Sequence, residues 1–139
     1  MTTGKEKLAL IINTAAYDRV AFAFNVAKSA AVVGKEVAML FGYGGLVRLR
    51  KGHIDDVGDE TEAWIREQLK AGVEKGSVPR ISEEMATFRM LGGKLYACPA
   101  AMALHNLIKD ELIEEVSEVC SVASFLSQNL QGTSALIYI

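Results

Sequence analysis

The sequence lacks the features that mark membrane proteins and nucleic-acid-binding proteins. Its longest strongly apolar runs, residues 8–12, 37–41 and 135–139, are five residues each. A membrane-spanning helix needs about 18 such residues, so we expect no membrane span. Basic residues are not in excess, because 15 Lys and Arg stand against 17 Asp and Glu. We therefore expect no nucleic-acid partner, since binding to phosphates requires a concentrated basic surface.

Cysteine is also scarce, and Cys98 and Cys120 are the only two. A chain of 139 residues buries roughly two-thirds of its unfolded surface on folding. It needs no disulfide, and we expect both thiols to be reduced. Residues 1–7 lack the long apolar region and the small-residue cleavage site of a secretory signal. We therefore expect a cytoplasmic protein.

Apolar residues, by contrast, are abundant for a chain of this size. With glycine counted and tyrosine left out, as in the usual comparison, the apolar share is about 56%, against ~45–50% in typical soluble domains. We expect residues 1–139 to form one domain. The surplus of apolar residues indicates an interface between copies of the chain, so a homo-oligomer is expected.

Short apolar segments alternate with amphipathic ones along the chain. The pattern predicts strands at 7–13, 36–41, 94–98, 118–120 and 134–138. It predicts helices at 18–33, 59–71, 82–91, 99–105 and 122–130, with Asp18, Asp59, Ser82 and Ser121 as candidate N-terminal caps. Strands that alternate with helices are typical of a parallel sheet covered on both faces. The sequence therefore predicts one three-layer α/β/α sandwich with about five parallel strands.

Ligands of such sheets bind beyond the carboxyl ends of the strands. The candidate pocket residues are Thr14 and Tyr17 after the first strand, Gly42, Tyr43, Gly44 and Gly45 after the second, and Cys98, Pro99, Ala100 and Ala101 after the third. We expect the chemistry of the protein to lie among them.

Cys98 is the candidate catalytic residue. It stands where the third strand ends and a helix begins, with Pro99 as the first helical residue and the amides of Ala100 and Ala101 unpaired. The partial positive charge at a helix N-terminus stabilises a thiolate and makes the sulfur nucleophilic at neutral pH. The alternative is that Cys98 is a small buried apolar residue. Cys120 is expected to be a packed structural thiol, because a resolving role requires a close approach to Cys98.

Four segments carry a resemblance to a known family. Residues 94–102 (Lys-Leu-Tyr-Ala-Cys-Pro-Ala-Ala-Met), 111–113 (Glu-Leu-Ile), 119–125 and 40–51 resemble the DsrE/DsrF-like sulfur-relay family, in particular its stand-alone "predicted peroxiredoxin" branch. The resemblance implies a parallel α/β/α sandwich that forms trimers or hexamers. It also implies that Cys98 accepts sulfane sulfur as a persulfide and passes it from a donor protein to an acceptor protein. Asn106 stands where members often have glycine, and asparagine tolerates the same left-handed conformation.

The remaining candidates indicate no cofactor or metal. Residues 42–45 are glycine-rich but lack both GxGxxG spacing and a P-loop, so we expect a tight turn in which backbone approaches Cys98 or a neighbouring subunit. His53 and His105 form no zinc-binding spacing with the cysteines, and His105 is expected at a helix end or an interface. The basic residues Arg48, Arg50 and Lys51 are expected to be solvated.

Two further functions stay open at this point. In one, Cys98 is oxidised to a sulfenic acid that a second thiol resolves, which makes the chain a peroxide-reactive protein. The lack of an evident nearby resolving cysteine counts against it. In the other, the chain is an oligomeric binding module and Cys98 is structural.

Overall fold

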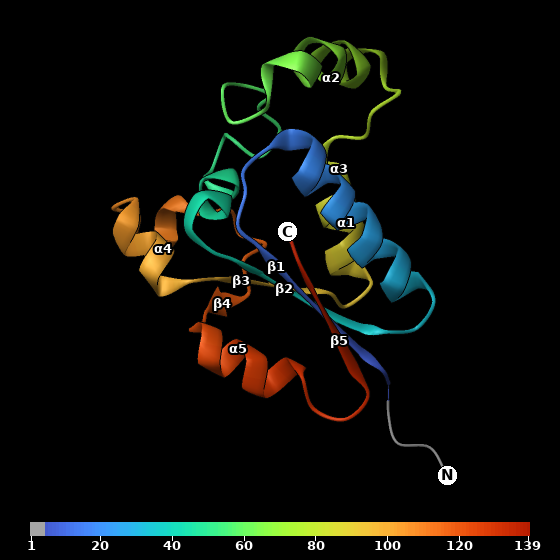
Figure 1. The fold of residues 1–139 in the computed structure, drawn as a ribbon, viewed down its shortest axis with the longest axis vertical. Coiled ribbons are helices and arrows are strands. Elements are labelled where there is room, and N and C mark those ends of the chain that lie inside the picture. Colours follow the sequence, from blue (N-terminus) through green and yellow to red (C-terminus); the bar gives the residue numbers. More distant parts are fainter. Residues whose placement is uncertain (1–4) are drawn as a thin grey trace.

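A computed structural model describes residues 5–139 as a five-stranded parallel sheet with helices around it (Figure 1). The strands are β1 (Lys7–Ile12), β2 (Glu36–Phe41), β3 (Lys94–Ala97), β4 (Glu118–Val119) and β5 (Ser134–Tyr138). The helices are α1 (Tyr17–Val32), α2 (Ala63–Lys75), α3 (Ile81–Met90), α4 (Pro99–Leu104) and α5 (Val122–Asn129), with short 3-10 segments η1 (Tyr43–Leu49) and η2 (Lys109–Glu111). The strand order is β4-β3-β2-β1-β5 and every pairing is parallel.

The three layers confirm the predicted α/β/α sandwich. α1 and α3 pack on each other over one face of the sheet, and α5 covers β1 and β2 on the other face (Figure 1). Aromatic rings join the layers: the ring of Phe24 lies 6.0 Å from that of Phe41 and 6.1 Å from that of Phe88. On the other side, the ring of Tyr96 lies 5.7 Å from that of Phe125. No helix among residues 5–139 is long and apolar enough to cross a membrane.

The predicted strands are confirmed to within one residue at each end, but several predicted helix ends are wrong. α1 begins at Tyr17, so Asp18 lies inside its first turn and does not cap it. α2 begins at Ala63, four residues after Asp59, and ends at Lys75, with Gly76 as its C-cap at a φ of 81°. α3 begins at Ile81, so Ser82 is already helical. Of the four predicted caps, Ser121 is confirmed, because its hydroxyl accepts a hydrogen bond from the amide of Ser124 at 3.2 Å.

Two helices are capped by side chains from the long connection between η1 and α2. The hydroxyl of Thr61 accepts a hydrogen bond from the amide of Tyr17, the first residue of α1, at 2.9 Å. The carboxylate of Asp55 accepts from the amide of Ser82 in α3 at 2.8 Å and from its hydroxyl at 2.5 Å. These bonds satisfy orphan helical amides in the way a local cap does. The connection therefore orients α1 and α3 from a distance.

The glycine-rich turn after β2 approaches β1. A Cβ on Gly45 would lie 2.5 Å from the carbonyl oxygen of Ile12 and 3.2 Å from that of Thr14. The expectation of a close backbone approach is right, but the backbone that comes close belongs to the end of β1. The glycine at position 45 lets η1 pack against the turn between β1 and α1.

Replacing Gly45 with alanine should therefore destabilise the protein. Forcing a Cβ against the backbone of Ile12 should lower the free energy of unfolding by about 1–3 kcal/mol. Gly44→Ala is the matched control, because a Cβ there would lie 3.6 Å from the carbonyl oxygen of Asn13, an ordinary contact. Urea denaturation of both variants checks this. Equal stability of the two variants would contradict it.

Candidate functional site

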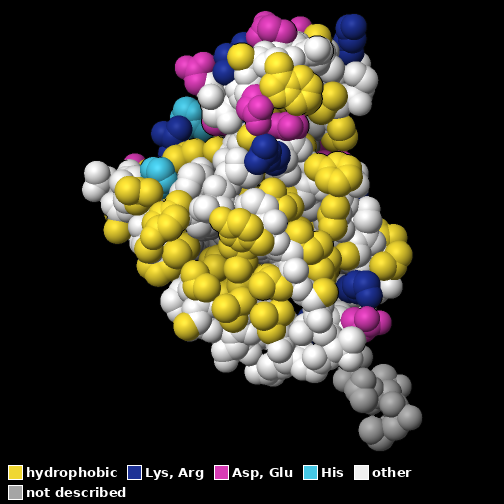
Figure 2. All heavy atoms as spheres, viewed as in Figure 1, with side chains coloured by type: hydrophobic (Ala, Val, Ile, Leu, Met, Phe, Trp, Pro, Cys, Tyr) yellow, Lys and Arg dark blue, Asp and Glu magenta, His cyan; other side chains and the backbone are white. Residues whose placement is uncertain are grey.

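An open, mostly apolar pocket of about 340 Å³ lies at the carboxyl edge of the sheet. Its walls are Ile11, Asn13, Gly42, Tyr43, Cys98, Ala100, Val122 and Tyr138. Figure 2 shows hydrophobic side chains gathered on this face of the molecule, over α4, α5 and β5. A larger hollow of about 490 Å³ lies at the opposite edge, among charged and polar residues such as Lys5, Glu36 and Gln131, and no thiol lines it. The pocket beside Cys98 is therefore the candidate site.

Cys98 sits at the junction between β3 and α4. Its backbone is extended, its amide donates to the carbonyl oxygen of Phe41 at 3.1 Å, and its carbonyl oxygen accepts from the amide of Met102 at 3.1 Å. Pro99 is the first helical residue, as predicted. Cys98 is 8% exposed and forms part of the pocket wall. A reactant that enters the pocket thus meets Cys98 in its wall.

Two polar contacts shape the pocket. The side-chain amide of Asn13 donates to the hydroxyl of Tyr138 at 2.9 Å, which links the ends of β1 and β5. The Nε2 of His105 lies 2.8 Å from the carbonyl oxygen of Tyr43, so Nε2 carries the proton of that bond. Tyr43 has a φ of 26°, in the region that a non-glycine residue seldom adopts. His105, at the end of α4, thereby holds Tyr43 at the mouth of the pocket.

Some of the predicted pocket residues line the pocket in the structure, and others lie outside it. Cys98, Gly42, Tyr43 and Ala100 line the pocket. Thr14 caps the turn after β1 by accepting from the amide of Ala16 at 3.1 Å, and Tyr17 is buried with its hydroxyl on the carbonyl oxygen of Pro79 at 2.9 Å. The other predicted residues, Gly44, Gly45, Pro99 and Ala101, are not among the lining residues.

Sequence reasoning missed half of the pocket wall. Ile11 and Tyr138 are register partners on β1 and β5, and Val122 begins α5. These residues reach Cys98 because β5 pairs with β1 and α5 crosses the sheet on that side. The strand order decides that β5 lies beside β1 and that α5 lies over this part of the sheet. The alternation of strands and helices in the sequence does not specify the strand order.

Cys120 lies at the end of β4, beside the end of β3. Its amide donates to the carbonyl oxygen of Ala97 at 2.9 Å. The thiol is buried, and burial raises its pKa above the ordinary value, with the charges of Glu118 and Cys98 acting in the same direction. Both cysteines are free thiols in the structure, as expected. The pairing of β3 with β4 therefore places Cys120 beside the residue that precedes Cys98.

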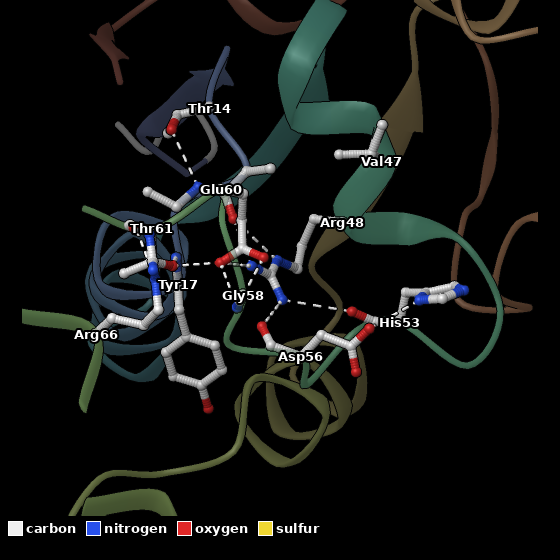
Figure 3. Close-up of polar contacts among 12 residues, drawn as sticks. Thr14, Tyr17, Val47, Arg48, His53, Asp56, Gly58, Glu60, Thr61 and Arg66 are labelled. Atoms are coloured by element: carbon white, nitrogen blue, oxygen red, sulfur yellow. Dashed lines mark hydrogen bonds and ion pairs between the residues drawn. The ribbon is translucent and has the colours of Figure 1, made fainter. Parts of the chain in front are cut away.

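The prediction that Arg48 is solvated is wrong, since its side chain is only 2% exposed. Figure 3 shows the guanidinium enclosed by backbone and side-chain oxygens. It donates to the carbonyl oxygens of Ala15 at 3.2 Å, Ile54 at 3.2 Å and Asp56 at 2.6 Å. It also pairs with the carboxylate of Glu60 at 3.5 Å, and its centre lies 5.5 Å from the ring of Tyr17. Burial lowers the pKa of Arg48, and Glu60 and Asp56 oppose that change.

The other basic residues of this segment make fewer contacts than Arg48. Arg50 is half-buried and donates to the carbonyl oxygen of Val47 at 3.3 Å, whereas Lys51 is exposed, as predicted. The Nδ1 of His53 lies 2.7 Å from a carboxylate oxygen of Asp56 on the surface. Within residues 5–139, no group of three or more His, Cys, Asp or Glu side chains is placed to hold a metal ion.

Comparison with known proteins adds the fold but not a family. No family model and no curated protein matches the sequence. The structure of a protein of unknown function, MTH1491 from Methanobacterium thermoautotrophicum, matches with a TM-score of 0.67 at 14% identity, covering 97% of this chain and 99% of that one. The ychN protein from E. coli matches with a TM-score of 0.64 at 10% identity, covering 96% and 99%. Similarity at this level shows a shared fold, and the DsrE/DsrF-like resemblance stays a prediction.

Removing the guanidinium of Arg48 should destabilise the protein strongly. Arg48→Met leaves Glu60 without its ion-pair partner and several buried carbonyls without their donor, which should cost about 3–5 kcal/mol in the free energy of unfolding. Arg50→Met removes one bond from a half-buried side chain and should cost about 1 kcal/mol or less. Chemical denaturation of the two variants measures both losses. A similar small loss in each would show that Arg48 does not organise this region.

Proposed function

We propose that this protein is a sulfur-relay protein that accepts sulfane sulfur as a persulfide on Cys98 and passes it to a partner protein. The observation that carries the proposal is the position of Cys98, a thiol in the wall of an open pocket at the carboxyl edge of a parallel sheet. The resemblance of residues 94–102 to the DsrE/DsrF-like family supports it. Cys98 is the one catalytic residue of this transfer.

The transfer is two successive thiol exchanges. The Cys98 thiolate attacks the outer sulfur of a donor persulfide, a new sulfur–sulfur bond forms, and the donor thiolate leaves with the electron pair of the broken bond. An acceptor thiolate then attacks the outer sulfur on Cys98 and restores the Cys98 thiolate. The sulfane sulfur keeps its oxidation state throughout, so the exchange consumes no oxidant, metal or cofactor.

The pocket suits this exchange in size and polarity. Its apolar walls exclude much of the water around a bound sulfur atom, and its open side admits the cysteine of another protein. The polar groups of Asn13 and Tyr138 lie in the same pocket and can hydrogen-bond an anionic sulfur. These features support transfer between proteins over turnover of a small enclosed substrate.

A peroxide-reactive thiol is the second candidate function. The sequence alone offers no evident resolving cysteine near Cys98, which counts against this function. The amide of Cys120 bonds to the carbonyl oxygen of Ala97, the residue before Cys98, so Cys120 is a candidate for the resolving cysteine. The two functions differ in the preferred reactant. A sulfur carrier reacts faster with persulfides, whereas a peroxidase consumes peroxide rapidly and saturably through Cys98.

Cys98→Ser should abolish sulfur loading and leave the fold intact. The change is nearly isosteric, but a hydroxyl does not take up sulfane sulfur under these conditions. After incubation with inorganic polysulfide and desalting, intact-mass measurement should find one added sulfur atom on the wild-type protein at early times and none on Cys98→Ser. Cys120→Ser is the matched control and should still load. Loading of Cys98→Ser would refute the assignment, and ordinary slow alkylation of an unloaded Cys98 would favour a structural role.

We also propose that copies of the chain assemble through the apolar face beside the pocket. The edge strand β5 exposes Leu136 by 47% and Tyr138 by 66%, next to the exposed ring of Tyr43. An unpaired sheet edge and a continuous apolar patch are both features of association surfaces. The resemblance to the DsrE/DsrF-like family implies a trimer or hexamer and supports the same conclusion.

Leu136→Glu should therefore shift the protein toward the monomer, because a carboxylate buried in an apolar interface is costly. Trp64→Glu is the matched control, since Trp64 is also exposed but lies on α2, away from β5 (Figure 1). Sedimentation or light scattering gives the mass of each. A wild-type protein with the mass of one chain would contradict the proposed assembly.

A further inference from the structure

The two thiols of the chain occupy corresponding positions on adjacent strands. β3 and β4 pair in parallel with Tyr96 opposite Glu118 and Ala97 opposite Val119. Cys98 and Cys120 are the next residues on each side. The bond from the amide of Cys120 to the carbonyl oxygen of Ala97 shows that the two backbones are still paired at this point.

Strand geometry directs both side chains to the same face. Register neighbours in a sheet point to one side, and residues two apart on a strand do the same. Tyr96 packs against Phe125 of α5, so Cys98 lies on the α5 face. Adjacent strands are ~4.8 Å apart, within the ~4.4–6.8 Å between Cα atoms that a disulfide requires. The charge of Cys98 also acts on the pKa of Cys120, which is a sign of the same proximity.

The two thiols differ in access. Both residues are buried, but Cys98 lines the pocket and Cys120 does not. A sulfur donor therefore reaches Cys98 first.

We propose that Cys120 resolves the Cys98 persulfide, forming a Cys98–Cys120 disulfide and releasing hydrogen sulfide. This inference rests on the proposed function, because it needs a persulfide on Cys98. The Cys120 thiolate attacks the inner sulfur of the persulfide, the Cys98 Sγ. A bond forms between the two Sγ atoms, and the bond to the outer sulfur breaks. The outer sulfur leaves as HS⁻ with the electron pair, so it is reduced while the two cysteines are oxidised. A dithiol reductant restores both thiols.

The timing of this reaction follows from the surroundings of Cys120. The titratable groups around it are Glu118 of β4, Tyr96 of β3 and Cys98, which directly follows β3. Burial, and after it the charges of Glu118 and Cys98, raise the pKa of Cys120, so near neutral pH it is mainly a thiol and attacks slowly. An acceptor protein that arrives promptly therefore takes the sulfur first. Resolution discharges sulfur that no acceptor collects.

The test follows the mass of the protein and the sulfide in solution after loading. Wild-type, Cys120→Ser and Cys98→Ser proteins are incubated with inorganic polysulfide, desalted and sampled over time without reductant. The wild-type protein should first gain one sulfur atom, then lose it and two hydrogen atoms, with one equivalent of sulfide released. Cys120→Ser should keep its added sulfur, and Cys98→Ser should gain none. Peptide mapping should join Cys98 to Cys120 within one chain.

The pH dependence provides a second readout. Below the pKa of Cys120, the rate of sulfide release should rise about tenfold per pH unit, in step with the thiolate fraction. Glu118→Gln removes one charge that raises this pKa, so it should speed release at neutral pH. A release rate independent of pH and of Glu118 would overturn the assignment of Cys120 as the attacking thiol.

The outcomes separate this inference from the proposed function. A wild-type protein that loads sulfur and holds it as firmly as Cys120→Ser would overturn the inference and leave the relay function standing. Absence of loading in both would overturn the relay function. In that case, oxidation with diamide tests the thiol pair alone: an intramolecular Cys98–Cys120 disulfide would support the pairing, and two thiols that stay reduced, or disulfides between chains, would overturn it.

Discussion

The buried guanidinium of Arg48 holds the carboxyl edge of the sheet in one arrangement. A charge removed from water is costly unless its donors are satisfied. Here backbone carbonyls of the turn after β1 and of the connection between η1 and α2 accept hydrogen bonds from the guanidinium. One contact fixes the turn after β1 at Ala15, and the others fix the backbone at residues 53–56. The connection so positioned carries Asp55 and Thr61 to the first turns of α3 and α1. One side chain thus helps to position the segment that caps two helices.

The same edge of the sheet carries the candidate chemistry, and the sheet register arranges it. Pairing of β5 with β1 brings Tyr138 beside Ile11 and Asn13, which closes one wall of the pocket. Pairing of β3 with β4 brings Cys120 beside Cys98. A pocket and a thiol pair thus arise from residues that are far apart in the chain, each placed by a strand that ends at the same level.

The parts of the fold that depend on local periodicity were predictable from the sequence. The apolar run of β2 by itself indicates a buried strand. The Ser121 cap of α5 is equally local, because its hydroxyl accepts from the amide of Ser124, three residues along the chain. The caps of α1 and α3 were not predictable, since Thr61 and Asp55 are distant from the helices that they cap. The burial of Arg48 was not predictable for the same reason, because the carbonyl oxygens that accept its hydrogen bonds include those of distant Ala15. Asn106, in contrast, adopts the predicted left-handed conformation, with a φ of 53°.

The sequence by itself determined that the chain forms one parallel α/β/α sandwich and that Cys98 stands where a strand meets a helix, because hydrophobic period and helix-starting residues act over a few positions. Only the tertiary structure decided the strand order, the walls of the pocket, the burial of Arg48 and the adjacency of Cys120. Each of these depends on contacts between segments that the chain brings together across the sheet, and side-chain period carries no information about which strands become neighbours.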